Sequence, residues 1–476
     1  MTIIITLAAY FALLLIVSRI TGRGADNKAF FRANRKSPWY MVAFGMIGAS
    51  ISGVTFVSVP GMVMVSDMTY LQTCMGFIVG YAIVAFVLLP VYYRMNLISI
   101  YEYLGSRFGR TTYLTGSWFF VISKLCGAAV SFYVVCMILQ DYVVEAWGVP
   151  FPLTVVVMVA LIWLYTRSGG IKTLVWTDSL QTICLFAALA MIIYNVADML
   201  GMDMGQAVAA VADSSMSRIV EMDDWMSRQY FWKQFISGAF IVVVMTGLDQ
   251  DKMQKNLTCR NLRDAQKDMC TYGLAFVPAN LLFLTLGVML VMLAQRQGGA
   301  LPGGDQLLPM FAASGHLGQM VVVLFTVGMV AAAFSSADSA LTSLTTTFCV
   351  DICQRTDSDR LRRMVHLVIS MAFVAVILMF KWFNNTSVID AIYIMVSYTY
   401  GPLLGVFAFG LTNKRKVRER WVPMVAVASP MLCYAFEHAA LALWGYQFGY
   451  ELLLLNGLLT WLGMLILSIN SVGRMP

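Results

Sequence analysis

The sequence predicts an all-α polytopic membrane protein, because the chain is long, apolar and poor in charge. Of its 476 residues, 59% are hydrophobic and only 12% are charged, and the mean hydropathy is +0.75. Soluble domains carry about 25% charged residues, so this chain has too little polar surface to face water. It also contains thirteen apolar segments of 17 to 31 residues. A helix needs roughly 20 residues to cross a bilayer core of about 30 Å.

The apolar segments follow one another along the whole chain, which predicts a single transmembrane domain over residues 1–476. They cover residues 2–20, 38–65, 68–93, 111–140, 150–166, 172–198, 231–250, 270–295, 318–348, 364–382, 387–411, 421–441 and 450–470. The longest gap, 200–230, is rich in Asp and Glu and predicts an amphipathic external loop. The nine cysteines and three histidines form no metal-binding pattern, which argues against metal catalysis.

Basic residues indicate the orientation of the helices. Most of the 32 Lys and Arg residues fall in alternate loops that share one side, and the positive-inside rule places that side in the cytoplasm. With thirteen crossings, the N-terminus is then outside and the C-terminus inside. In segment 2–20 the basic residues follow the apolar run, which predicts an anchor that stays and not a signal peptide. The net charge of +7 reflects this topology and gives no reason to expect a nucleic-acid partner.

Two of the segments carry signs of a broken helix. Segment 38–65 collects Gly, Ser, Thr and Pro between positions 45 and 61, and 231–247 is a weaker second case. They open two blocks of five helices, 38–198 and 231–411, which leaves 2–20 as an extra N-terminal helix and 421–470 as two C-terminal helices. A break at the start of each half is typical of inverted-repeat transporters, whose site lies at the bilayer midplane. The alternative is small-residue packing between helices, which also enriches Gly and Ser.

Ionisable residues inside predicted spans are candidates for function, because burying charge in lipid is costly. Lys124, Asp178 and Asp338 stand out. Ser335, Asp338 and Ser339 share one helical face, and their oxygens suit a hard cation together with carbonyls freed by a broken helix. Lys124 has two interpretations: it neutralises Asp338 or Asp178, or it contacts an anionic group of a solute.

Four motifs resemble the sodium:solute symporter family, whose core has the inverted-repeat fold of the bacterial leucine transporter. They occur in the family's order and cover nearly the whole chain. The motifs are Pro90-Val91-Tyr92-Tyr93-Arg94 with Ile100-Tyr101-Glu102-Tyr103-Leu104, Gly169-Gly170 to Asp178 and Gln181, Asp249-Gln250 with Gln254-Lys255, and Ala332-Ala333-Phe334-Ser335-Ser336.

The resemblance implies one sodium site between the first and eighth core helices. Its carbonyl ligands would come from Gly48, Ile51 and Ala332, and its hydroxyl ligands from Ser335 and Ser336. Some members hold a further sodium at a site that maps to Asp178, Ser335, Asp338 and Ser339. This chain departs from the family there, because many members have Ser or Thr where it has Asp338.

For the solute, the stretch from Ser52 to Thr55 is similar to the first core helix of sialic-acid transporters, where hydroxyls meet the solute. Lys124, Gln72 and Tyr398 are the further candidates for substrate binding. The stretch 242–246 lacks the Asn and aromatic residues that the sugar branch of the family carries there.

The resemblance implies sodium-coupled symport of a small polar organic solute into the cell by alternating access, with sodium as the coupling ion. The solute classes left open are a sialic acid, a sugar or polyol, and a carboxylate or amino acid. The alternative is a proton-coupled symporter that uses Asp338 or Asp178. We expect a multi-pass protein of the inner (plasma) membrane, in contact with lipid and competent as a monomer. An enzyme is disfavoured, since no His-Glu-x-x-His, paired nucleophile and base, or phosphate-binding loop is present.

Overall fold

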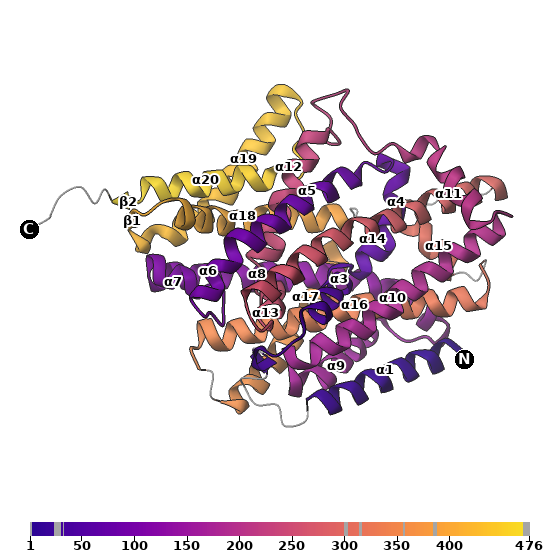
Figure 1. The fold of residues 1–476 in the computed structure, drawn as a ribbon, viewed down its shortest axis with the longest axis horizontal. Helices are drawn as coiled ribbons and strands as arrows, with labels where there is room; N and C mark the ends of the chain where they lie inside the picture. The colour runs from indigo at the N-terminus through magenta and orange to yellow at the C-terminus, as the bar shows by residue number, and fades with distance from the viewer. Residues whose placement is uncertain are drawn as a thin grey trace, which may run out of the picture.

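A computed structural model describes residues 2–22, 30–31, 33–298, 303–313, 317–355, 358–383 and 388–469, and their regular structure is almost entirely helical (Figure 1). The α-helices are α1 Thr2–Thr21, α3 Trp39–Ser50, α4 Gly53–Ser66, α5 Tyr70–Ile83, α6 Leu89–Arg94, α7 Glu102–Phe108, α8 Arg110–Leu139, α9 Phe151–Gly169, α10 Ile171–Met199, α11 Met204–Ala212, α12 Phe231–Val242, α13 Gln250–Asn256, α14 Leu262–Gln297, α15 Leu307–Ala313, α16 Gln319–Thr347, α17 Asp359–Phe383, α18 Val388–Thr412, α19 Val422–Trp444 and α20 Leu452–Ile466. Two short strands, β1 Lys416–Val417 and β2 Ser468–Ile469, pair antiparallel.

Within the described residues, eight helices are long and apolar enough to cross a membrane. Two further spans are helix pairs bent at a break, and three shorter apolar helices cover 5–21, 151–167 and 452–466. Each of the thirteen segments predicted from the sequence overlaps one of these elements. The all-α membrane fold is therefore confirmed, whereas the number of crossings stays a prediction.

Both predicted breaks are present. The axes of α3 and α4 differ by 61°, and Ser52 caps the start of α4 by accepting a hydrogen bond from the Thr55 backbone N–H at 3.4 Å. The second break turns the chain by 69° between the helical run Phe231–Gly247 and α13. It falls just after the stretch singled out in the sequence, at Asp249, whose side chain caps α13.

The first break lies against α10 and α16, because α3 approaches α10 very closely. A Cβ atom at Gly48 would lie 1.9 Å from Thr182 Oγ1 and 3.1 Å from the Thr182 backbone, so only glycine fits. One turn earlier, a Cβ at Gly45 would lie 3.1 Å from the Asp178 Cβ. α10 also packs along α16. These contacts bring the broken segment, Asp178 and the hydroxyl-rich half of α16 together.

The remaining helices surround this centre. α1 packs on α9 along one edge of the molecule, and α18, α19 and α20 form the opposite edge (Figure 1). Large apolar side chains such as Trp382, Leu443 and Ile466 are exposed on the outer helices. Their exposure fits a surface that lipid covers.

Candidate functional site

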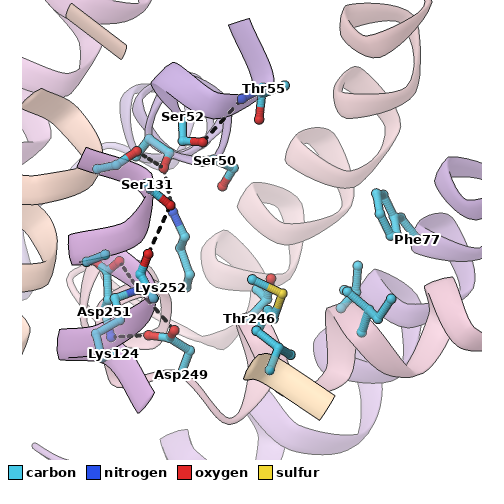
Figure 2. Close-up of a pocket in the computed structure, with 18 of the residues that line it drawn as sticks. Ser50, Ser52, Thr55, Phe77, Lys124, Ser131, Thr246, Asp249, Asp251 and Lys252 are labelled. Atoms are coloured by element: carbon cyan, nitrogen blue, oxygen red, sulfur yellow. Dashed lines mark hydrogen bonds and ion pairs between the residues drawn. The ribbon is translucent and has the colours of Figure 1, made fainter. Parts of the chain in front are cut away.

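The two breaks face each other across a cavity of about 200 Å³ (Figure 2). Polar side chains from both breaks and from α8, α16 and α18 line it. They are Ser50, Ser52, Thr55, Ser123, Lys124, Ser131, Thr246, Asp249, Asp251, Lys252, Ser336 and Tyr400. A concave site with a few convergent polar groups at the junction of broken helices is where membrane transporters bind their solutes.

Oxygen atoms gather where the first break meets α16. The last backbone hydrogen bond of α3 runs from the Ile51 N–H to the Ile47 carbonyl, so the carbonyls of residues 48–51 accept no hydrogen bond from a following turn of helix. The Ser336 hydroxyl lies 3.3 Å from the Ala49 carbonyl and 3.2 Å from the Ala332 carbonyl. Ser336 thus joins the two elements that the family resemblance implies for sodium.

The carboxylates predicted to form a second ion site lie next to this cluster and already have partners. Ser335 donates to Asp178 Oδ1 at 2.7 Å, and the Lys255 ammonium lies 2.8 Å from Asp178 Oδ2. Both charged side chains are 1% exposed. Asp338 accepts hydrogen bonds from Tyr165 at 2.6 Å and from Ser339 at 3.1 Å.

Lys255 corrects the sequence interpretation of the basic residues after the second break. The positive-inside rule treats Lys252 and Lys255 as cytoplasmic loop charges, but the structure buries both, with 8% and 1% exposed. The missed signal was the mixture of aspartates and lysines between Asp249 and Lys255, because buried charges are normally paired. Tyr165 lies in an apolar run, where nothing in the sequence distinguished it from a packing residue.

Lys124 pairs with neither Asp338 nor Asp178, contrary to one interpretation of the sequence. Its ammonium lies 3.0 Å from Asp249 Oδ2 and 2.7 Å from Asp251 Oδ2, at the second break. Tyr400 donates to the same Asp249 oxygen at 2.9 Å. Lys124 also lines the cavity, but its charge is already opposed by two carboxylates.

Of the other predicted solute-binding residues, Ser52 and Thr55 line the cavity, whereas Gln72 and Tyr398 do not. The Gln72 amide is bonded to the loop before α12, donating to the Gln229 carbonyl and accepting from the Glu221 N–H, both at 2.9 Å. The Tyr398 hydroxyl donates to Glu437. Tyr400, two residues further along α18, reaches the cavity instead.

Comparison with known proteins bears directly on this site. The sequence pattern of the Sodium:solute symporter family matches residues 30–419, which contain both breaks and the cavity. The chain belongs to the sodium:solute symporter family. Similar relatives include the sodium/sialic acid symporter NanT of Aliivibrio fischeri, 26% identical over 86% of this chain and 83% of its own length. The sodium/sialic acid symporter SiaT of Proteus mirabilis is 23% identical over 85% of this chain and 83% of its own length.

The fold of the symporter is shared with solved structures. A substrate-bound, outward-open Na⁺-coupled sialic acid symporter superposes with a TM-score of 0.82 at 19% identity, covering 98% of this chain and 97% of that one. Membership of the family confirms the prediction of sodium-coupled solute transport and places the chain in the plasma membrane as a multi-pass protein. The family consists of transporters.

Proposed function

We propose that the symporter couples import of its solute to one sodium ion, bound between the first break and α16 by the carbonyls of Gly48, Ile51 and Ala332 and the hydroxyls of Ser335 and Ser336. The observation that carries this proposal is the position of the Ser336 hydroxyl, within hydrogen-bond distance of carbonyls on both elements. Hard cations require several oxygen ligands, and this is where carbonyls released from a helix meet hydroxyls. The Ala49 carbonyl, which faces Ser336, is a further ligand candidate.

A second sodium at Asp178, Ser335, Asp338 and Ser339 is not part of the proposal, because the Lys255 ammonium already lies against Asp178. A tethered ammonium supplies the positive charge that a second ion would bring. One sodium crossing about 100 mV releases about 2.3 kcal/mol, which supports roughly 50-fold accumulation from the voltage alone.

The solute we propose is a small polar organic molecule that occupies the cavity between the two breaks. Ser52, Thr55 and Lys124 support this placement, since all three line the cavity. The size of the cavity suits a small solute, and the hydroxyls on its walls can form hydrogen bonds with hydroxyl, carbonyl or carboxylate groups of that solute. The sialic acid, sugar or polyol, and carboxylate or amino acid classes all meet these requirements.

The proposed topology has thirteen crossings, with the N-terminus outside and the C-terminus inside. Residues 38–198 and 231–411 then form the two inverted repeats, and a monomer suffices for transport. The bent helix pair at the start of each block supports this division. The excess of basic residues on one side supports the orientation.

Replacing Ser336 by Ala tests the sodium site without knowledge of the solute. The melting temperature of purified protein is titrated with NaCl at constant ionic strength, with KCl as the balance. The loss of one ligand is expected to raise about tenfold the sodium concentration that gives half of the maximal stabilisation. This factor corresponds to the loss of one hydrogen bond to a charged group. Ser343→Ala is the matched control, because its hydroxyl is buried on the same helix and, among the described residues, bonds only to the Ala340 carbonyl.

An unchanged sodium titration for Ser336→Ala would remove this residue from the site. Uptake into proteoliposomes distinguishes sodium coupling from proton coupling. Transport that persists without sodium and collapses at alkaline pH would favour a proton on Asp338 or Asp178.

A further inference from the structure

Lys252 lies on the cavity wall with its positive charge unopposed at contact distance. Its side chain is 8% exposed, and its ammonium donates a 2.8 Å hydrogen bond to the Ala49 carbonyl. Among the described residues, no carboxylate oxygen lies within 4.0 Å of this ammonium. The other two buried lysines of the centre, Lys124 and Lys255, each lie against at least one carboxylate.

The Lys252 ammonium also lies beside the proposed sodium site. The Ala49 carbonyl that it contacts is the one that faces the Ser336 hydroxyl at 3.3 Å. Figure 2 shows the Lys252 side chain extending away from the Lys124–Asp251 pair, toward the first break and Ser52. Lys252 therefore borders both the proposed ion site and the cavity.

The formal charges on the described cavity wall sum to zero. Lys124 and Lys252 are matched by Asp249 and Asp251. Asp178 and Asp338 lie next to the proposed site, with the Lys255 ammonium against Asp178. The ligands proposed for sodium are carbonyls and hydroxyls, all neutral, so the bound ion adds one positive charge to the cavity wall. A buried charge without a partner is costly, and here a second positive charge lies next to it.

We propose that Lys252 binds a carboxylate of the solute and that the transported solute is a small organic monoanion. This inference rests on the proposed sodium site and deepens it. A carboxylate held between Lys252 and sodium opposes both positive charges, so each of the two ligands makes the binding of the other more favourable. Lys124 is the less suitable anchor, because two aspartates already surround its ammonium. The hydroxyls of Ser52 and Thr55 are then left for the neutral part of the solute.

The first arm of the test measures sodium binding in the absence of solute. Replacing Lys252 by Met keeps the length of the side chain and removes the neighbouring charge. We expect sodium to bind about tenfold more tightly to this variant, as judged by ²²Na⁺ binding to purified protein. Lys267→Met is the matched control, since Lys267 is an exposed lysine and its loss should leave sodium binding unchanged.

The second arm compares acids with neutral counterparts of similar shape. The pairs are N-acetylneuraminate and its methyl ester, pyruvate and pyruvamide, and galacturonate and galactose, each tested for a rise in melting temperature in sodium and in potassium. For the intact protein we expect a shift only for an acid and only with sodium. Lys252→Met should weaken that acid's binding at least about tenfold, and Lys252→Arg should retain it.

Unchanged sodium affinity in Lys252→Met overturns the inference, as does equal binding of an acid and its neutral partner. If no compound of the panel binds, the sodium arm decides alone. Binding of a neutral compound that still requires sodium refutes the role of Lys252 but leaves sodium coupling intact. A Ser336→Ala variant with normal sodium affinity, by contrast, refutes the proposed ion site itself.

Discussion

Replacing Lys255 by Met is expected to destabilise the protein strongly and to create a need for a second cation. Lys255 Nζ and Asp178 Oδ2 lie 2.8 Å apart, and each side chain is 1% exposed. Without the ammonium, Asp178 is a buried carboxylate whose one side-chain hydrogen bond within the described part of the chain comes from the Ser335 hydroxyl. Breaking a buried ion pair on one side costs about 3–5 kcal/mol, because the remaining charge is uncompensated.

The loss of stability in Lys255→Met should depend on which cation is in the buffer. In Lys255→Met the two carboxylates of Asp178 and Asp338, with the hydroxyls of Ser335 and Ser339, form an oxygen-rich site without an ammonium. Sodium should enter this site and recover part of the lost stability, whereas potassium should recover less because it is larger. We therefore expect the variant to show two sodium-binding events where the intact protein shows one.

A double-mutant cycle measures the pair itself. Lys255→Met, Asp178→Asn and the double variant are unfolded with SDS in mixed micelles, in sodium and in potassium. Because neutralising Asp178 removes the charge that Lys255 opposed, the double variant should be more stable than the sum of the two single losses predicts. Strictly additive losses would refute the ion pair. A sodium stoichiometry that stays at one in Lys255→Met would refute the idea that the lysine replaces a second ion.

Two further substitutions test the contacts around the cavity. Gly48→Ala places a Cβ 1.9 Å from Thr182 Oγ1, so we expect a loss of about 1–3 kcal/mol in stability together with weaker sodium binding. Thr182→Gly in the same chain should restore part of both, and a Gly48→Ala variant with normal melting temperature would contradict the close approach. Lys124→Met leaves Asp249 and Asp251 without their shared cation, and it should cost about 3–5 kcal/mol in stability. The same substitution at exposed Lys267 should cost nothing measurable, and equal losses at both sites would contradict the buried pairing of Lys124.

The sequence predicted the membrane elements well because their signal is local. Apolar length identifies a span, and small or polar residues concentrated in one span, as from Gly45 to Gly61, identify a break. The family motifs added the residues around the ion site. All of these signals depend on composition or on neighbours along the chain, so no knowledge of distant contacts was needed.

Charge partners were predicted poorly because they depend on contacts between distant segments. One interpretation paired Lys124 with Asp178 or Asp338, because this lysine lies near the middle of a predicted span. The structure instead brings Asp249 and Asp251 to Lys124, and Lys255 to Asp178. The positive-inside rule counts basic residues near span ends and does not distinguish a solvated lysine from one folded back into the protein.

The charged residues of the second break hold α13 against neighbouring helices. All seven residues of this short helix are buried, and three of them tie it to different elements. Lys255 pairs with Asp178 on α10, Asp251 with Lys124 on α8, and Lys252 with the Ala49 carbonyl on α3. Two of these ties are ion pairs between buried side chains, and only the third is a single bond from a charge to a neutral oxygen.

The third tie is the one that ligands are best placed to exchange. Separating either ion pair leaves a buried charge alone, which is costly, so those pairs should hold α13 to α8 and α10 in every state. The Lys252 contact can be exchanged more cheaply, because sodium can take over the Ala49 carbonyl while a solute anion takes over the ammonium. We infer that joint binding of ion and solute loosens α13 from α3 at this point alone. An ion without a solute would leave Lys252 facing a second positive charge, so we expect neither ligand to cross efficiently without the other.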